Sequence, residues 1–116
     1  MRPPLVSDEV CARTMLNRMY HAAYLETRQA LRTHLGNPAF DVSHAALAGS
    51  LSGATDPDVR ALGWRLDALR SAREDSDYKP RVNIPRAVAA LHLVNARFIL
   101  DNAGKLAGRF PRVRRR

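Results

Sequence analysis

Four basic side chains lie along one side of the first predicted helix, and their chemistry suits phosphate binding. They are Arg18, His21, Arg28 and Arg32. Successive steps of three, seven and four residues return to nearly the same direction on a helix. Because a guanidinium group binds phosphate oxygens through two parallel hydrogen bonds, this stripe predicts a phosphate-binding groove, with Tyr20 or Tyr24 at its edge to stack a base. The alternative is an ordinary solvated helix face.

A second group of candidate residues lies near the end of another predicted helix. Arg73 and Asp77 are four residues apart, which is one helical turn, so these two side chains can form an ion pair. With the neighbouring Tyr78 they either hold this helix end against the first helix or orient RNA in a cleft. His44 leaves a similar choice open, between capping or packing a short helix and a functional role.

The composition is that of one basic globular domain. The chain has 116 residues, 46% of them hydrophobic and 26% charged, which is enough for one core and too little for two. The formal net charge is +8, and among 19 basic residues only Lys79 and Lys105 are lysine. An arginine-dominated surface permits a nucleic-acid partner. A genome rich in G and C would give the same arginine bias without any binding function.

Several kinds of site are not expected from the residues present. Cys11 is the single cysteine, so it cannot form an internal disulfide, and no arrangement of His or Asp around it argues for a metal ligand or a nucleophile. We therefore expect neither a metal nor a cofactor. The N-terminal residues contain no apolar segment typical of a signal peptide, and no apolar run approaches the roughly 18 residues of a membrane span. These observations predict a cytoplasmic protein with no membrane segment.

The elements that position the first group of residues are predicted to be helical. Ser7 is a capping residue followed by two acids, and the helix that it starts should end near Gly36. A short helix follows, capped by Asp41 or Ser43 and extending through Leu51. The apolar positions of the long helix recur at three- and four-residue steps and predict its buried face: Leu16, Tyr20, Ala23, Tyr24, Thr27 and Leu31.

Two more long helices complete the predicted domain. Asp56 and Pro57 form the start signal of the third helix, and Asn83 with Pro85 repeats it for a fourth helix that ends near Gly108. The third helix should bury Val59, Leu62, Leu66 and Leu69, and the fourth should bury Val88, Leu91, Val94, Phe98 and Leu106. We expect an all-α antiparallel bundle of three long helices and one short helix in residues 1–108, followed by a disordered basic tail in residues 109–116.

Three short segments occur in an order that resembles one subgroup of the HEPN superfamily, small helical domains of toxins, defence systems and nucleotidyltransferase partners. NRMYHAAY places an arginine and spaced aromatic residues on a long helix. VSHAALAGSL places His44 at the start of the following short helix, and REDSDY contains Arg73, Asp77 and Tyr78. The resemblance covers roughly residues 10–100. It implies the HEPN-like bundle and gives His44, Arg73, Asp77 and Tyr78 the status of family-motif residues.

The resemblance also implies a candidate catalytic pair. Catalytic HEPN domains are similar to metal-independent ribonucleases, in which an arginine and a histidine four to six residues apart meet across a dimer interface. Histidine can move the proton of a ribose 2′-hydroxyl while arginine stabilises charge on the phosphate. Two pairs here have a separation of six residues, Arg86 with His92 and Arg28 with His34. About two such spacings are expected by chance in this composition; the position of Arg86 at a helix start favours the first pair.

The resemblance leaves two functions open. One is an RNA-directed endoribonuclease of a toxin–antitoxin or phage-defence system, acting as a homodimer, with an antitoxin or nucleotidyltransferase as a further partner. The other is a non-catalytic module that binds RNA, a nucleotide or a protein. This chain lacks most of the helix that usually precedes the arginine–aromatic helix of the subgroup, so we expect a second copy of the chain to supply the missing packing surface.

Overall fold

The computed structural model describes the backbone of residues 6–78 and 86–112 and the side chains of residues 14–74 and 87–112. Four α-helices follow one another along the chain: α1 (Val6–Leu35), α2 (His44–Ser52), α3 (Pro57–Tyr78) and α4 (Arg86–Leu106), with a short 3-10 helix, η1 (Ala107–Arg109), after α4. The described residues form no strand. Three long helices and one short helix were expected, and the all-helical architecture is confirmed.

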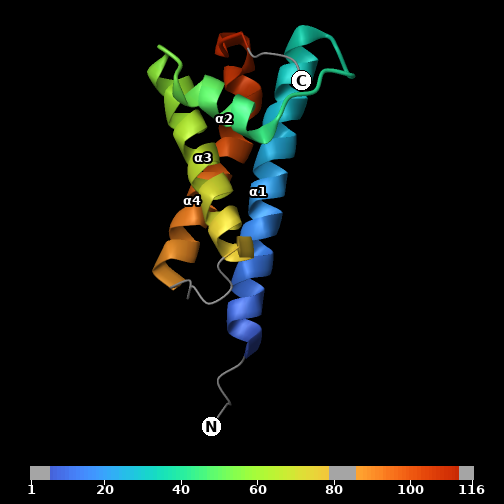
Figure 1. Ribbon diagram of the computed structural model, residues 1–116. Helices are drawn as coiled ribbons and strands as arrows, with labels where there is room; N and C mark the ends of the chain where they lie inside the picture. Colours follow the sequence, from blue (N-terminus) through green and yellow to red (C-terminus); the bar gives the residue numbers. More distant parts are fainter. Residues whose placement is uncertain (1–5, 79–85, 113–116) are drawn as a thin grey trace.

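The long helices lie side by side, with α3 running opposite to α1 and α4 (Figure 1). In the view of Figure 1, the chain runs upward through α1, crosses the upper end of the bundle in α2, runs downward through α3 and runs upward again through α4. α4 packs against both α1 and α3, while α2 packs mainly on α3. The short helix therefore covers one end of the bundle, and its first residues lie next to the middle of α1.

Local signals in the sequence determine where the helices begin and end. The Ser43 side chain caps α2 by accepting a hydrogen bond of 3.2 Å from the backbone N–H of Ala46. The Asp56 carboxylate accepts a hydrogen bond of 3.0 Å from the backbone N–H of Asp58, at the start of α3. Gly36 follows the end of α1 at a φ of +66°, a left-handed conformation in which glycine has no Cβ to cause strain. The predicted start and stop signals at these residues are confirmed.

The predicted buried faces of α1 and α3 are also confirmed, but the predicted face of α4 is wrong except at Leu106. All six predicted positions on α1 and all four on α3 are buried. On α4, Val88, Leu91 and Val94 are exposed and Phe98 is only partly buried. Among the predicted positions only Leu106 is buried, and the core face consists otherwise of Asn95, Ala96, Ile99 and Ala103. Apolar residues occur on nearly every side of the first turns of α4, so that helical periodicity could not identify the side that packs.

The C-terminal boundary also differs from the expected one. Arg109, which we expected to begin a disordered tail, donates a hydrogen bond of 2.6 Å from Nε to the Asp56 carboxylate and lies 3.2 Å from that of Asp58. Phe110 packs partly buried against the core. These contacts join Arg109 to the start of α3 and Phe110 to the core, so these two residues belong to the packed domain. Residues 113–116 lie outside the described part.

Candidate functional site

Two tyrosine rings and a histidine ring form the base of the candidate site. Tyr20 and Tyr24 lie one turn apart on α1, both buried, with ring centroids 6.3 Å apart. His44, the first residue of α2, packs on them with centroid distances of 5.3 Å to Tyr20 and 3.7 Å to Tyr24. The hydroxyl group of Tyr20 is hydrogen-bonded to His44 Nδ1. The hydroxyl group of Tyr24 donates a hydrogen bond of 2.7 Å to the carbonyl of Val42, which fixes the chain just before α2.

Two guanidinium groups lie over these rings from different helices. Arg28, on α1, has its guanidinium carbon 5.5 Å from the centroid of Tyr24, and Arg73, on α3, is 5.4 Å from that of Tyr20. Contacts of this length are in the range of cation–π attraction. Tyr20, Tyr24, Arg28, His44 and Arg73 are named together the Tyr–His–Arg cluster. Three helices contribute to it, and its members are as many as 53 positions apart in the sequence.

The arginines of this cluster are oriented by polar contacts as well as by the rings. Arg73 Nε donates a hydrogen bond of 3.1 Å to the side-chain oxygen of Asn17, and an Arg28 nitrogen lies 3.9 Å from the Asp41 carboxylate. The neighbouring Arg70 is engaged by two acids of its own helix, Asp67 at 2.9 Å and Glu74 at 3.0 Å. Arg28 and Arg73 are therefore the two guanidinium groups that the fold places on the tyrosine rings.

The hydrogen bond between the Tyr20 hydroxyl group and Nδ1 of His44 restricts where the imidazole can carry its proton. Burial is the main cause that raises the pKa of Tyr20 to about 12, so the phenol keeps its proton at neutral pH. When it donates that proton to Nδ1 of a neutral imidazole, the N–H of His44 must be on Nε2. When His44 becomes a cation, Nδ1 instead donates to the phenol oxygen. When Nδ1 donates to the phenol oxygen, Nε2 is the nitrogen that can gain or lose a proton, whereas when the phenol donates to Nδ1, Nε2 carries the N–H and acts as a hydrogen-bond donor.

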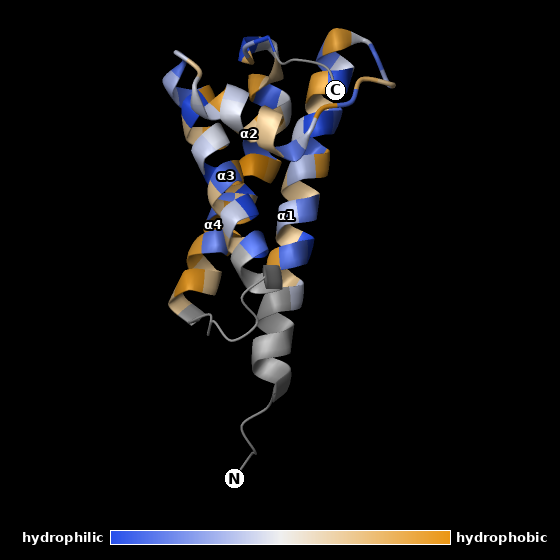
Figure 2. Cartoon of the chain, in the orientation of Figure 1, coloured by the Kyte–Doolittle hydropathy of each residue, from blue (hydrophilic) through white to orange (hydrophobic). Residues whose placement is uncertain are grey.

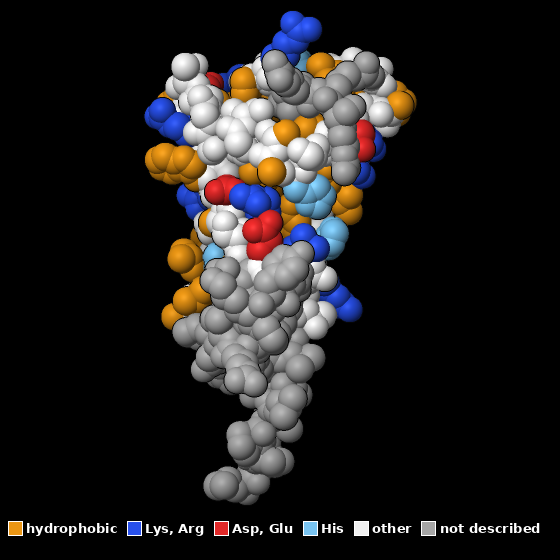
Figure 3. Space-filling model, viewed as in Figure 1, with side chains coloured by type: hydrophobic (Ala, Val, Ile, Leu, Met, Phe, Trp, Pro, Cys, Tyr) orange, Lys and Arg blue, Asp and Glu red, His pale blue; other side chains and the backbone are white. Residues whose placement is uncertain are grey.

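The surface above the cluster carries further polar side chains. In Figure 3, histidine side chains lie over the middle of α1, beside arginine and acidic side chains at the centre of the visible face. His21 is exposed there, with its ring centroid 6.0 Å from that of Tyr20. Arg18 is also exposed. Arg32, in contrast, donates a hydrogen bond of 2.5 Å from Nε to the carbonyl of Phe40 and so holds the loop between α1 and α2.

One residue of the predicted RNA-binding set has a different position from the one expected. Tyr20 was expected at the edge of the basic stripe, where its ring could stack on a base, but only 1% of its surface is exposed. Its ring belongs to the core and its hydroxyl group holds His44. The reason is its spacing: Tyr20 is one turn after Leu16 and one turn before Tyr24, on the apolar side of α1.

Of the two arginine–histidine pairs, Arg28 and His34 are not brought together, and the second pair lies partly outside the described residues. Six residues on a helix correspond to a rotation of about 240°, so Arg28 and His34 diverge: Arg28 lies on Tyr24, and His34 lies near Gly108 on another side of α1. Arg86 is the first residue of α4, and its side chain lies outside the described residues. His92 is partly buried, and its Nδ1 has no hydrogen-bond partner among the described residues. The side chains of Asp77 and Tyr78 are likewise outside the described part.

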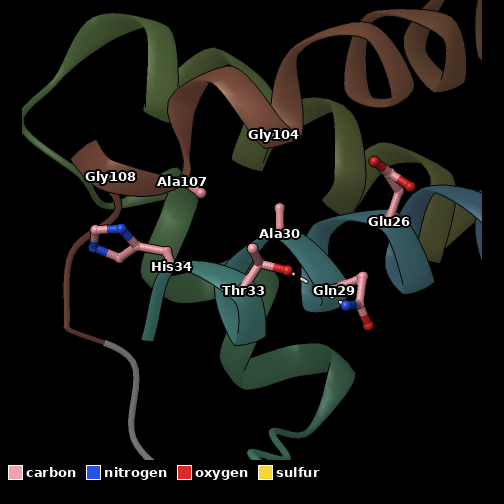
Figure 4. A pocket seen from close by; sticks show the side chains of 8 residues that line it. All are labelled: Glu26, Gln29, Ala30, Thr33, His34, Gly104, Ala107 and Gly108. Carbon is pink, nitrogen blue, oxygen red and sulfur yellow. Dashed lines mark hydrogen bonds between the residues drawn. The ribbon is translucent and has the colours of Figure 1, made fainter. Parts of the chain in front are cut away.

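A groove at the C-terminal end of α1 lacks the arginines of the cluster. It measures about 330 Å³ and lies between α1, α4 and η1. Figure 4 shows Glu26 and His34 near opposite ends of it, with Gln29 and Thr33 joined by a hydrogen bond of 3.4 Å between them. Among the described residues, no arginine or lysine lines it. Since Glu26 would repel a phosphate, this groove suits RNA less well than the Tyr–His–Arg cluster does.

Other kinds of site receive no support from the described residues. Among them, no group of three or more His, Cys, Asp or Glu side chains is placed to hold a metal ion. None of the helices in the described part of the chain has the length and apolar character needed to cross a membrane. Comparisons with known protein-family models, curated proteins and solved structures found no match to this chain.

The sequence indicates most members of the Tyr–His–Arg cluster, but it does not predict the contacts between them. Motifs point to His44 and Arg73, and helical spacing points to Arg28, whereas no signal identifies Asn17 as the hydrogen-bond acceptor of Arg73. The contact between α3 and α4 had no signal at all: Arg65 donates a hydrogen bond of 3.0 Å to Asn95 and lies 4.2 Å from the centroid of the Phe98 ring. No local pattern pairs residues that are 30 positions apart, so only the fold could reveal this contact.

The burial of His92 leads to a prediction about pH. Burial lowers the pKa of His92 below the ordinary value of 6.5. At a pH between the lowered pKa of the folded state and the ordinary pKa of the unfolded state, the unfolded chain binds a proton that the folded chain does not. The free energy of unfolding therefore falls as the pH falls below 6.5. We expect wild-type protein to lose stability relative to the His92→Gln variant between pH 7.5 and pH 5.5, measured by urea unfolding. An identical pH dependence of the two proteins would contradict the burial of His92.

Proposed function

We propose that this chain is an RNA-directed domain of the HEPN type and that the Tyr–His–Arg cluster contacts the RNA backbone. The observation that carries the proposal is the convergence of Arg28, His44 and Arg73 on the two buried tyrosine rings. Guanidinium groups recognise phosphate in two-hydrogen-bond geometry, and an imidazole can donate to a phosphate oxygen or exchange a proton with a ribose hydroxyl. The exposed Arg18 and His21 extend this surface along α1.

The rings have a definite part in this proposal. An arginine on a flexible chain loses side-chain entropy when it binds a phosphate. Arg28 and Arg73 are already held over Tyr24 and Tyr20, so less of that freedom remains to be lost on binding. The neutral Tyr20 phenol, in turn, holds His44 in place through Nδ1. The buried tyrosines thus support the RNA-contacting groups, and stacking on bases is not their role.

Removal of the cluster arginines tests RNA binding. We expect Arg28→Ala and Arg73→Ala each to weaken binding of a single-stranded RNA about tenfold, equivalent to about 1.4 kcal/mol, measured by fluorescence anisotropy. The slope of log affinity against log salt concentration should fall by about 0.7 for each lost phosphate contact. Arg60→Ala is the matched control, because Arg60 is an exposed arginine of α3 whose removal changes the net charge equally. Equal losses in all three variants would reduce the effect to net charge and contradict the proposed site.

Cleavage is the catalytic form of the same proposal. Two histidines are candidates for the proton transfer: His92, with Arg86, on the resemblance to catalytic HEPN domains, and His44, with Arg73, on its place in the cluster. To distinguish the two candidate histidines, RNA is incubated with each variant in excess EDTA and the products are analysed on a gel. If cleavage is lost in His44→Gln but kept in His92→Gln, the cluster is the catalytic site, and the reverse result assigns it to the α4 pair. Intact RNA in the presence of tight binding would leave the non-catalytic binding module as the function.

A further inference from the structure

The groove shown in Figure 4 carries polar groups that the Tyr–His–Arg cluster does not use. It has a volume of about 330 Å³, and we name it the α1–α4 groove. Polar side chains of α1 line it together with small residues of α1 and α4, among them Glu26, Gln29, Thr33, His34, Ala30 and Gly104. Glu26 lies two residues after Tyr24, and a step of two residues turns by about 200° around a helix. The groove therefore opens on the side of α1 opposite the cluster, and it lies away from the apolar first turns of α4 (Figure 2).

Glu26 is an acid that forms no ion pair with any of the described residues. The positions three and four residues before and after it hold alanine or glutamine, so α1 offers it no cation at helical spacing. Most other acids of the described chain pair with arginines: Asp41 with Arg28, Asp67 and Glu74 with Arg70, and Asp56 and Asp58 with Arg109. In a chain with a net charge of +8, the fold thus leaves this one carboxylate of the groove for a cation from outside.

The end of the groove at Glu26 is negative. In Figure 4 the Glu26 carboxylate points from α1 toward α4. Asp101 precedes Gly104 by three residues, which is about one helical turn, and α1 and α4 run in the same direction. This second acid therefore lies toward the same end of the groove, and it also forms no ion pair with the described residues. The two carboxylates attract a positively charged ligand.

Gln29 provides a second hydrogen-bond acceptor for such a ligand. Its amide nitrogen donates a hydrogen bond of 3.4 Å to the hydroxyl oxygen of Thr33. The amide oxygen of Gln29 remains as an acceptor one helical turn from Glu26. A guanidinium group carries five N–H donors in one plane and can form two parallel hydrogen bonds with a carboxylate. It can therefore contact Glu26 and still donate to Gln29, which the compact ammonium group does less well.

The small residues of the groove leave room for the aliphatic stem that carries such a group. Ala30 and Ala107 are buried, and a Cβ atom at Gly104 would meet nothing within 4 Å beyond its chain neighbours and its own helix. An unbranched stem can lie along this surface in apolar contact. At the far end, the Thr33 hydroxyl group and the His34 ring can donate hydrogen bonds to a carbonyl oxygen. We propose that the α1–α4 groove binds a guanidinium group on an unbranched aliphatic stem, the chemistry of an arginine side chain.

Titration with N-acetylarginine amide tests this site without any RNA. In heteronuclear NMR spectra of isotope-labelled protein, we expect saturable shifts centred on residues 26–34 and 104–108. A shallow groove of this kind should give a dissociation constant of about 1 mM. N-acetylcitrulline amide is the matched ligand, because it has the same shape without the charge, and it should bind at least about tenfold more weakly. A short glycine peptide with arginine at its centre distinguishes the sources: at least about tenfold tighter binding than the amide assigns a polypeptide segment, and equal binding a free arginine derivative.

Two variants alter the groove in independent ways. Glu26→Gln removes the charge without changing the shape, and it should weaken binding of N-acetylarginine amide at least about tenfold. Gly104→Leu fills the open space and should abolish binding, and its side chain meets no neighbour that would prevent folding. Glu74→Gln on α3 and Gly49→Leu on α2 are the matched controls outside the groove. Each control should change the affinity by less than about twofold.

Three results would overturn the site. They are an absence of saturable shifts, equal binding of the arginine and citrulline amides, and equal weakening by Glu26→Gln and Glu74→Gln. Circular dichroism spectra establish that the variants fold, and the citrulline comparison decides the charge requirement on wild-type protein alone. The proposal does not rest on RNA binding, because the groove and the cluster lie on opposite sides of α1. A chain that binds the arginine amide but no RNA would contradict only the proposed function.

Discussion

Replacement of Gly63 by alanine is expected to destabilise the protein by about 2 to 3 kcal/mol, although alanine is the better helix former. Gly63 is buried in α3 where that helix crosses α2. A Cβ atom at this position would overlap backbone atoms of Leu51 and Ser52, and it would lie 2.7 Å from Ser52 Cα. Backbone atoms cannot rotate away as a flexible side chain can, so the two helices must separate. The separation would loosen the contacts of Leu51 with the core.

The measurement is a thermal unfolding curve with a matched glycine control. A loss of this size should lower the melting temperature by about 10 °C in a domain of this length. Gly49→Ala on α2 is the control, because a Cβ there meets no atom within 4 Å beyond its chain neighbours and the backbone of its own helix. That variant should gain about 0.5 to 1 kcal/mol from the higher helix propensity of alanine. If both variants gain stability, α2 and α3 do not approach as closely as the structure has them.

Truncation of Ile99 to alanine should cost still more, about 2 to 5 kcal/mol of unfolding free energy. Ile99 has no exposed surface and lies between Ala96 and Ala103 on the core side of α4. Loss of its side chain leaves a cavity that the neighbouring rigid helices can fill only in part. Urea unfolding, analysed by linear extrapolation, measures the change.

Leu100 provides the control for this truncation. It is adjacent in sequence and apolar, but it is 41% exposed. Leu100→Ala should therefore change the unfolding free energy by no more than about 0.5 kcal/mol. Similar costs at the two positions would mean that α4 is rotated about its axis relative to the orientation described. The comparison thus tests the correction to the predicted face of α4 directly.

The helix ends and the buried side of α1 are the parts of the fold that could be predicted from the sequence. Ser43, Asp56 and Gly36 act within a single turn of helix, through a capping side chain or a left-handed backbone, so the helix ends are readable from the sequence. On α1 the apolar residues occupy one side and the charged residues another, and the buried side follows from the spacing. Local chemistry and periodicity are sufficient wherever a helix has only one possible core face.

The candidate site could be predicted only as separate pieces. Arg28, His44 and Arg73 each had a reason in the sequence to be singled out, but the contact of His44 with Tyr20 and Tyr24 joins residues from two helices. Tyr20 was expected to meet a base and instead lies in the core. A stripe calculated from spacing gives the direction of a side chain on its own helix, and it carries no information on what lies opposite.

The sequence by itself determined that this chain is helical, where its helices end, and which sides of α1 and α3 are buried. Only the tertiary structure decided which side of α4 packs and how the arginines meet the tyrosine rings. The physical reason is that α4 has apolar residues in almost every direction, so its orientation depends on the neighbouring helices. Small residues such as Ala96 and Ala103 allow α4 to approach α1 and α3 closely. This close approach favours burial of the side of α4 that carries Ile99 over the side that carries Val94.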